Sequence, residues 1–222
     1  MAYNIYMTRI SREFDAALAA AFLAAGDRVY AGMAELTPPE GCVVVNALPL
    51  DTFSTQQAMA GIPSIDCFVD TTEARLPGDG GSIREGLDDT ALRESFRANL
   101  MAPLAALEAA LPLMERSGMK RIVFMNSADA SVMYSAATRG FGHNMSKAAL
   151  NNVLMVCFNR LRPLGYTFRI YDPLEGQVSP SAAAAGAYVY ITRNRCLDEH
   201  NASRDGENTL VVRDALGREL PW

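Results

Sequence analysis

The chain has 222 residues, 50% of them hydrophobic, and its 25 acidic and 20 basic residues leave a formal net charge of -5. This length can bury one sizeable core but is too short for two comfortable domains, so we expect residues 1–222 to form a single domain. Charges of both signs are interspersed. Because no basic face results that could neutralise phosphates, the charge pattern argues against nucleic-acid binding.

No segment is typical of export or of membrane insertion. The N-terminus, Met-Ala-Tyr-Asn-Ile-Tyr, lacks a basic segment followed by an apolar run. The longest apolar run, residues 16–25, is far short of the roughly 20 residues that span a bilayer. The four cysteines lie far apart, without a C-x-x-C spacing or histidine neighbours. We therefore expect a cytoplasmic protein that has buried thiols, holds no metal and contacts no membrane.

Short β-branched and aromatic runs alternate with helical stretches, which is the order that builds a parallel sheet with helices on both faces. Strands are predicted near Ile5, Val29, Val44, Phe68, Val123, Phe168 and Val211. Helices are predicted over residues 14–25, 52–60, 89–116 with a break or bend near Pro103, 144–162 and 181–197, and a polar loop over 198–208. The pattern predicts an α/β fold, a doubly wound sheet of about seven strands with its ligand crevice at the carboxyl ends of the strands.

The connection between the second and third strands is unusually short. It comprises only residues 32–41 and contains Pro38-Pro39. Because a crossover helix does not fit in this length, we expect that helix to be missing.

The helix over 144–162 has apolar residues on more than one face. A surface helix normally has a single apolar stripe. We therefore expect this helix to be covered by its own sheet on one side and by a second subunit on the other. The alternative is a central core helix in a monomer.

Four segments resemble the short-chain dehydrogenases/reductases. They are Arg121-Ile-Val-Phe-Met-Asn-Ser127, Met145-Ser-Lys147-Ala-Ala-Leu, Arg162-Pro-Leu-Gly-Tyr-Thr-Phe-Arg-Ile-Tyr-Asp-Pro173, and Phe96-Arg-Ala-Asn99-Leu-Met-Ala-Pro103. The likeness extends over nearly the whole chain. It implies a Rossmann-like fold and, for an active member, an NAD(P)-dependent oxidoreductase.

The cofactor loop of that family is strongly altered. The family begins its first helix with Thr-Gly-x-x-x-Gly-x-Gly, whose glycines let the backbone approach the pyrophosphate. The matching stretch here is Thr8-Arg9-Ile10-Ser11-Arg12-Glu13-Phe14-Asp15, so all three glycine positions carry charged side chains. These side chains would fill the phosphate space, and the two carboxylates would repel a phosphate. Arg9 and Arg12 are either solvated loop charges or bind a phosphate in a different way.

Two further glycine positions of the family are also changed. Its Asn-Asn-Ala-Gly, beside the adenosine half of the cofactor, matches Asp70-Thr71-Thr72-Glu73, and its Pro-Gly near the nicotinamide matches Pro173-Leu174. The close backbone approach that glycine permits is lost there. The degenerate loop Thr8, Arg9 and Arg12 thus predicts no cofactor, and NAD(P) only if the chain is an active oxidoreductase.

The family's catalytic set is present in part. Ser127, Lys147 and Asn99 match, whereas the tyrosine four residues before the lysine is His143. His143 could act as a general acid or base, and with Ser127 and Asp129 it could form a nucleophile, base and orienting carboxylate. The structural alternatives are a turn cap for Ser127, a surface charge for Lys147, a structural histidine, and a helix-bending Asn99. Tyr134 is a further candidate for the acid.

Three functions remain open. The first is a non-catalytic or regulatory subunit, a pseudoenzyme that pairs with itself or with an active short-chain dehydrogenase through helices 89–116 and 144–162. The second is a divergent NAD(P)-dependent oxidoreductase acting on a carbonyl or alcohol. The third is a cofactor-independent lyase, isomerase or hydrolase that uses Ser127 and His143. The sequence does not determine a substrate.

Overall fold

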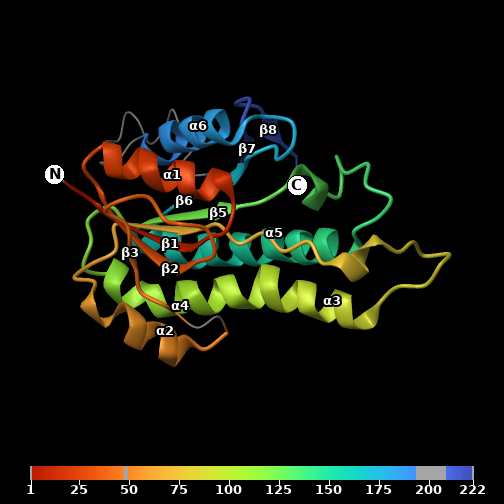
Figure 1. Ribbon diagram of the computed structural model, residues 1–222, viewed down its shortest axis with the longest axis horizontal. Coiled ribbons are helices and arrows are strands. Elements are labelled where there is room, and N and C mark those ends of the chain that lie inside the picture. Colours follow the sequence, from red (N-terminus) through yellow and green to blue (C-terminus); the bar gives the residue numbers. More distant parts are fainter. Residues whose placement is uncertain (1, 48–49, 194–208, 222) are drawn as a thin grey trace.

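The computed structural model describes residues 2–47, 50–193 and 209–221. Its centre is one sheet with the strand order β3-β2-β1-β4-β5-β6-β7-β8, parallel except for the antiparallel pair β7 and β8 (Figure 1). The strands are β1 Asn4–Ile10, β2 Arg28–Ala34, β3 Val43–Val44, β4 Cys67–Asp70, β5 Arg121–Met125, β6 Thr167–Asp172, β7 Val212–Asp214 and β8 Glu219–Leu220. The predicted doubly wound α/β sheet is therefore confirmed.

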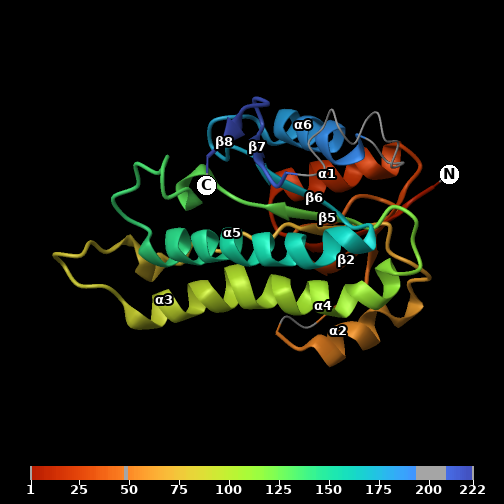
Figure 2. The same cartoon turned by 180° about the vertical axis from the view of Figure 1, so that it is seen from behind.

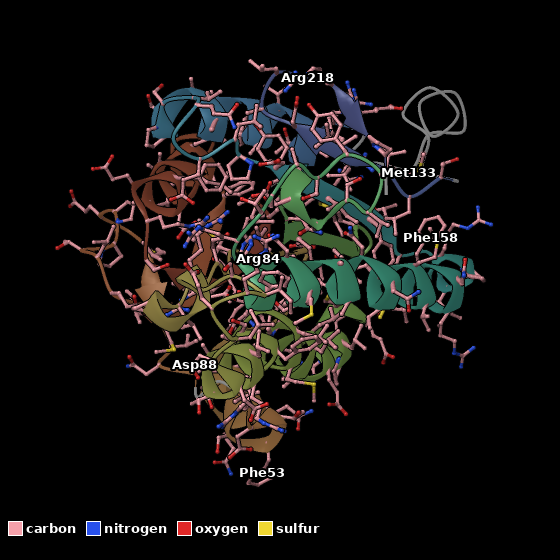
Figure 3. The ribbon with its side chains drawn as sticks, turned by 90° about the vertical axis from the view of Figure 1, so that its right-hand side faces the viewer. Phe53, Arg84, Asp88, Met133, Phe158 and Arg218 are labelled. Carbon is pink, nitrogen blue, oxygen red and sulfur yellow. The ribbon has the colours of Figure 1, made fainter. Side chains whose placement is uncertain are left out.

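Helices cover both faces of the sheet. The α-helices are α1 Glu13–Ala24, α2 Thr52–Ala58, α3 Asp89–Phe96, α4 Ala102–Met114, α5 Phe141–Leu161 and α6 Pro180–Thr192. Short 3-10 turns are η1 Met59–Gly61, η2 Pro77–Gly80, η4 Ala128–Ala130 and η5 Arg162–Leu164, and η3 Arg97–Met101 is a π turn. Helices α1 and α6 lie on one face, and α4, α5 and α2 lie on the other, as the end-on view of Figure 3 shows (Figures 2 and 3).

Two hydrophobic clusters hold these layers together, one on each face of the sheet. Alternate residues of β1 separate into them: Ile5 and Met7 face α1 and α6, while Tyr6 faces α4 and α5. The central strands β4, β5 and β6 are buried along their whole length. Burial of every position, whichever face it points to, is the pattern of a parallel sheet with both faces covered.

Several local predictions differ from the structure in detail. An eighth strand, β8, was not predicted, because two residues are too few to show a strand period. The strand predicted near Val211 is present as β7, which begins at Val212. Helix α5 begins at Phe141, three residues before the predicted start, after Gly140 in the left-handed conformation. Helix α6 ends at Thr192, and the predicted continuation over 194–197 and the loop over 198–208 lie outside the described residues.

The two irregular features expected from the sequence are present. Residues 35–42, between β2 and β3, contain no helix. The break near Pro103 is a π turn, Arg97–Met101, that joins α3 to α4. In a π turn the backbone hydrogen bonds join residues five apart, so the regular α-helical pattern is interrupted. Pro103 has no backbone N–H, which is tolerated because it lies in the first turn of α4. The turn places Asn99 with its side chain directed inward, as described below.

Among the cysteines, Cys67 is buried as predicted, whereas Cys42 and Cys157 are partly exposed; all three are free thiols, and Cys196 lies outside the described residues. No group of metal-ligating side chains occurs within residues 2–47, 50–193 and 209–221. In the same part of the chain, none of the helices is both long and apolar enough to cross a membrane.

Candidate functional site

The carboxyl ends of β1, β4, β5 and β6 meet at one edge of the sheet, as expected for neighbouring parallel strands (Figure 1). The loops that follow these strands enclose two hollows of about 590 and 90 Å³. Arg12, Pro173, Glu175 and Gln177 line both hollows, which therefore form one cleft. Of the sequence-predicted site residues, Arg12, Ser127 and Asp129 line this cleft.

The start of α1, at the edge of the cleft, is occupied by a side chain of the same helix. Asp15, which has no exposed surface, accepts hydrogen bonds from the backbone N–H groups of Ser11 at 3.1 Å and Arg12 at 2.9 Å. Helix N-termini have unpaired N–H groups and attract anions. Asp15 thus takes the place of an external anion at these two donors.

Arg12 neutralises this internal carboxylate. Its guanidinium binds Asp15 at 2.9 Å and the backbone oxygen of Thr71 at 3.0 Å, and it pairs with Glu175 at 3.4 Å. Arg12 is therefore not a solvated loop charge, since only 14% of its side chain is exposed. Arg9 forms an ion pair with Glu35.

A buried ionic cluster lies below the cleft and joins β4 to α5. Glu73, three residues beyond the end of β4, places one carboxylate oxygen 2.5 Å from His143 Nε2 and the other 3.1 Å from Lys147 Nζ. Lys147 also donates to the backbone oxygens of Thr72 at 2.8 Å and Met125 at 3.1 Å. The ammonium thus has two hydrogen bonds to backbone oxygens and one ion pair with a carboxylate.

All three members of this cluster are withdrawn from solvent. Lys147 is 0% and His143 1% exposed, and the Glu73 side chain is 8% exposed. The interpretation of Lys147 as a surface charge is therefore wrong. The second ring nitrogen of His143, Nδ1, lies 3.2 Å from Asn144 Oδ1. Both ring nitrogens therefore have a polar partner, Nε2 in Glu73 and Nδ1 in Asn144.

Glu73 is held in its charged form. Burial alone would raise its pKa, but the Lys147 ammonium, the hydrogen bond and charge of His143, and Arg75 together keep the pKa well below the usual 4.5. When the pKa of an acid is lower in the folded than in the unfolded protein, its ionised form stabilises the fold at pH values above the unfolded-state pKa. This stabilisation is lost as the pH falls below the unfolded-state pKa toward the folded-state pKa.

We therefore expect the stability difference between the wild type and Glu73→Gln to shrink as the pH falls below about 4.5. Urea unfolding of both proteins from pH 7 to pH 3 measures this difference. Other buried acids, such as Asp172, are present in both proteins, so their contributions to the pH dependence cancel in the difference. A difference that does not change over this range would contradict the ionic role of Glu73.

The two other matched residues make structural contacts. Asn99 in the π turn accepts a hydrogen bond from Ala74 N at 2.8 Å and donates to Ala74 O at 2.9 Å and Ser146 Oγ at 3.1 Å. Asn99 thereby joins the π turn η3 to the segment after β4 and to α5. Ser127 Oγ accepts from Asp129 N at 3.2 Å and caps η4, which agrees with its interpretation as a turn cap.

The proposed Ser127, His143 and Asp129 arrangement is not assembled. Ser127 and Asp129 line the cleft, whereas His143 lines a separate hollow beside Asp79. Within the described residues, no hydrogen bond joins His143 to either of the other two. Tyr134 is 51% exposed on the segment after η4 and does not line the cleft.

The floor of the cleft contains a further acid, Asp172, at the end of β6. Burial raises its pKa, and the charges of Asp214 and Glu73 raise it further, while hydrogen bonds from the N–H groups of Leu174 at 2.8 Å and Ala128 at 2.7 Å act against this. Because both oxygens of Asp172 bind backbone N–H groups, its evident task is to join the loops after β5 and β6.

Sequence reasoning missed two residues. Glu73 was noted only as a departure from a glycine position, although a carboxylate at a strand end beside a buried lysine is a usable signal. Asp79 accepts hydrogen bonds from Gly142 N at 2.7 Å and His143 N at 2.8 Å, and thus caps α5 from η2. No sequence signal identifies Asp79, because this cap lies more than 60 residues from its helix.

No protein-family model matches the chain. The chain is 25% identical over 139 residues to the C-signal of Myxococcus xanthus, covering 61% of this chain and 81% of that protein. It is also 25% identical over 126 residues to an uncharacterized oxidoreductase of Saccharomyces cerevisiae, covering 57% of this chain and 48% of that protein. The second match thus extends over about half of the yeast protein.

Solved structures resemble the whole chain more closely in shape than in sequence. A carbonyl reductase from Pseudomonas aeruginosa PAO1 in complex with NADP has a TM-score of 0.80 at 22% identity, with both chains covered completely. The carbonyl reductase Sniffer of Drosophila melanogaster has a TM-score of 0.80 at 14% identity, again with complete coverage. The chain therefore has the Rossmann-like α/β fold of the short-chain dehydrogenases and carbonyl reductases.

Proposed function

We propose that this protein is a divergent, non-catalytic or regulatory subunit with the short-chain dehydrogenase fold. The observation that carries the proposal is the placement of the Glu73 carboxylate between His143 and Lys147. The buried Lys147 ammonium donates to two backbone oxygens and is paired with the Glu73 carboxylate. On this proposal the lysine is held by these internal partners and is therefore not directed at a cofactor or an acidic hydroxyl, and no tyrosine stands at the matched position, which is His143.

The cofactor region supports the same conclusion. The NAD(P) that this fold commonly holds would need the N–H groups at the start of α1 for its pyrophosphate. Here Asp15 binds the N–H groups of Ser11 and Arg12, the two residues just before α1, and Arg12 neutralises Asp15. A pyrophosphate approaching the start of α1 would lie beside a buried carboxylate of the same charge sign. These residues do not fit a dinucleotide, and we include none in the function.

Calorimetric titration with NAD, NADH, NADP and NADPH, each to millimolar concentration, tests the proposal. We expect no saturable binding, because the helix N-terminus has its own anion. The Pseudomonas aeruginosa carbonyl reductase, whose structure contains NADP, is the positive control. Saturable binding of any of the four would contradict the proposal and would favour the second candidate.

The subunit role needs a contact surface, which we place on residues 89–116, which contain α3 and α4, and on residues 144–162, which contain most of α5. Met145 and Val156 lie eleven residues apart on α5, and therefore on one side of it, and they are 41% and 61% exposed. Met101 at the start of α4 is 53% exposed. The partner is a second copy of this chain or an active subunit with the same fold.

We expect Val156→Glu to shift the sedimentation coefficient of the purified chain toward that of a monomer, because a carboxylate would be buried in the interface. Val189→Glu on α6 is the matched control, since Val189 is equally exposed, at 61%, on the opposite face of the sheet. A wild-type chain that sediments as a lone, stable, monodisperse monomer would count against self-association, as would equal effects of the two variants.

The second candidate is a divergent NAD(P)-dependent oxidoreductase acting on a carbonyl or alcohol. It is favoured by the retention of Ser127, Lys147 and Asn99 and by the NADP- or NADPH-bound carbonyl reductases that share the fold. The dinucleotide titration separates the two. A cofactor-independent enzyme using Ser127 and His143 is the weaker alternative, because these side chains line different hollows.

A further inference from the structure

The ends of β6 and β7 place two carboxylates side by side. Asp172 and Asp214 are register partners in the parallel pairing of these strands. Each follows by two positions a residue of the hydrophobic cluster under α4 and α5, Ile170 and Val212, so both carboxylates lie on the same face. Asp172 is 5% and Asp214 1% exposed. Because like charges opposite each other on neighbouring strands repel, this pair needs a cation or a proton to balance it.

One guanidinium acts on both carboxylates. Arg218, in the turn between β7 and β8, donates from Nε to Asp214 Oδ2 at 2.6 Å and from its backbone N–H to Asp214 Oδ1 at 2.9 Å. Its charge also interacts with that of Asp172. Among the described residues, however, no cationic side chain donates a hydrogen bond to Asp172. The Arg218 side chain is 52% exposed, so water screens its charge, and Asp172 is the less well balanced of the two acids.

The other charges near Asp172 have its own sign or are bound by other groups. Glu73, after β4, adds a further negative charge, although it belongs to the buried ionic cluster with its own cations. The hollow of about 90 Å³ that Asp172 lines also contains the charged side chains Arg12, Arg75, Asp129 and Glu175. Both of these arginines are already paired with carboxylates, at 2.9 to 3.4 Å. Burial therefore raises the pKa of Asp172, and the charges of Asp214 and Glu73 raise it further.

Asp172 joins two loops of the cleft, and one of them is strained. Its oxygens accept hydrogen bonds from Ala128 N, after β5, at 2.7 Å and from Leu174 N, after β6, at 2.8 Å. Leu174 has a φ of 51°, in the left-handed region, which costs a residue with a side chain about 1–2 kcal/mol. A proton on Asp172 removes the charge from both hydrogen bonds, and charge-assisted bonds are about twice as strong as neutral ones. Proton uptake therefore weakens the contacts that hold the strained loop.

We propose that Asp172 is a pH-sensitive latch of the cleft. Ionised, it holds the loops after β5 and β6 together; when it takes up one proton from solvent, it loosens its hold on Ala128 and Leu174, and the loop after β6 moves away from η4. The latch opens without unfolding the chain, because an acid whose pKa is higher in the folded than in the unfolded protein stabilises the fold when it takes up a proton. The latch does not depend on whether the protein is a non-catalytic subunit.

Hydrogen exchange of single amides in the full chain, followed by NMR from about pH 7 to about pH 3.5, tests the latch. We expect the protection of the Ala128 and Leu174 amides, relative to an unstructured amide at the same pH, to fall by about fivefold or more. The midpoint should coincide with that of the Asp172 carboxyl resonance and lie above the roughly 3.9 of an exposed aspartate. The amides of Leu216 and Arg218, which a different carboxylate binds, should keep their protection. Constant protection of the first two amides, or equal loss at all four, would overturn the proposal.

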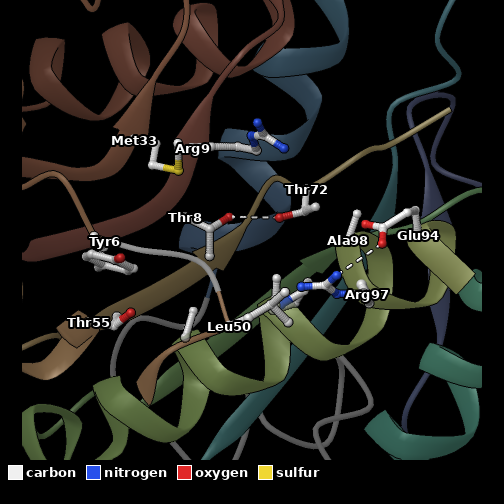
Figure 4. A pocket seen from close by; sticks show the side chains of 14 residues that line it. Tyr6, Thr8, Arg9, Met33, Leu50, Thr55, Thr72, Glu94, Arg97 and Ala98 are labelled. Atoms are coloured by element: carbon white, nitrogen blue, oxygen red, sulfur yellow. Dashed lines mark hydrogen bonds and ion pairs between the residues drawn. The ribbon is translucent and has the colours of Figure 1, made fainter. Parts of the chain in front are cut away.

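Three variants assign the effect to Asp172. Asp172→Asn is uncharged at every pH, and its amide group can accept at only one of the two positions, so we expect both backbone amides to be loosened already at pH 7 without a further change on acidification. If this variant does not fold, the wild-type titration still decides. Arg218→Gln removes the shared guanidinium and should raise the midpoint of Asp172. Glu94→Gln is the control, because Glu94 pairs with Arg97 at the wall of a separate cavity beside α4 (Figure 4), and it should leave the midpoint unchanged. A pH-dependent protection that persists in Asp172→Asn, or equal midpoints in Arg218→Gln and Glu94→Gln, would overturn the latch.

Discussion

Replacing Glu73 by alanine is expected to lower the free energy of unfolding by about 3–5 kcal/mol, the usual cost of leaving one charge of a buried pair without its partner. Lys147 has no exposed surface, and Glu73 is its charged partner at 3.1 Å. The two remaining contacts of the ammonium are backbone oxygens, which cannot replace the lost charge. Urea unfolding at pH 7 measures the effect.

Two further variants separate the buried cluster from ordinary charge removal. Glu94→Ala removes the exposed carboxylate that pairs with Arg97, and we expect it to change the free energy of unfolding by no more than about 1 kcal/mol. Combining Glu73→Ala with Lys147→Met should destabilise less than the sum of the single changes, because the buried ammonium is then removed together with its closest carboxylate. Additive effects of Glu73→Ala and Lys147→Met would show that the two side chains do not act as a pair.

Replacing Asp15 by alanine should have the second largest effect, a loss of about 3 kcal/mol, because it removes a helix cap and a buried ion-pair partner together. The backbone N–H groups of Ser11 and Arg12 would lose their acceptor, and the Arg12 guanidinium its closest carboxylate. Chemical denaturation compared with the wild type measures the loss.

Glu13→Ala is the matched control for this change. Glu13 is an exposed carboxylate in the same first turn of α1, so its removal costs only the interaction with the helix dipole, about 0.3–1 kcal/mol. If Asp15→Ala were as mild as Glu13→Ala, the internal anion would not stabilise α1. The proposed obstacle to pyrophosphate binding would then lose its main support.

The pair of Glu73 with Lys147 and the pair of Asp15 with Arg12 have the same physical character. In each, a carboxylate of the chain satisfies donors at the carboxyl edge of the sheet, so that these donors need no external ligand. Glu73 satisfies Lys147 and His143, and Asp15 satisfies the start of α1. A site with this many internal contacts is stable without a ligand, which suits a subunit that contributes a surface rather than a reaction.

Much of the fold could be predicted because it depends on local patterns. Short β-branched and aromatic runs marked the buried strands β4, β5 and β6, and the short segment between β2 and β3 excluded a crossover helix. Pro103 indicated the break in the helix over 89–116. The ends of elements were less accurate, since the start of α5 depends on Gly140 and on the distant cap Asp79.

The sequence by itself determined the order of strands and helices, the likeness to short-chain dehydrogenases, and the positions of Ser127, Lys147 and Asn99. It also determined that charged residues replace the glycines of the cofactor loop. Only the tertiary structure decided what those charges do. Asp15 binds its own helix, and Glu73 binds two residues on α5, 70 or more positions away in the chain. The contacts of Glu73 depend on burial and on the meeting of the end of β4 with α5, which no local pattern encodes. The hydrogen bonds of Asp15 reach only three and four residues back, and there the structure decided that the carboxylate is buried and paired with Arg12.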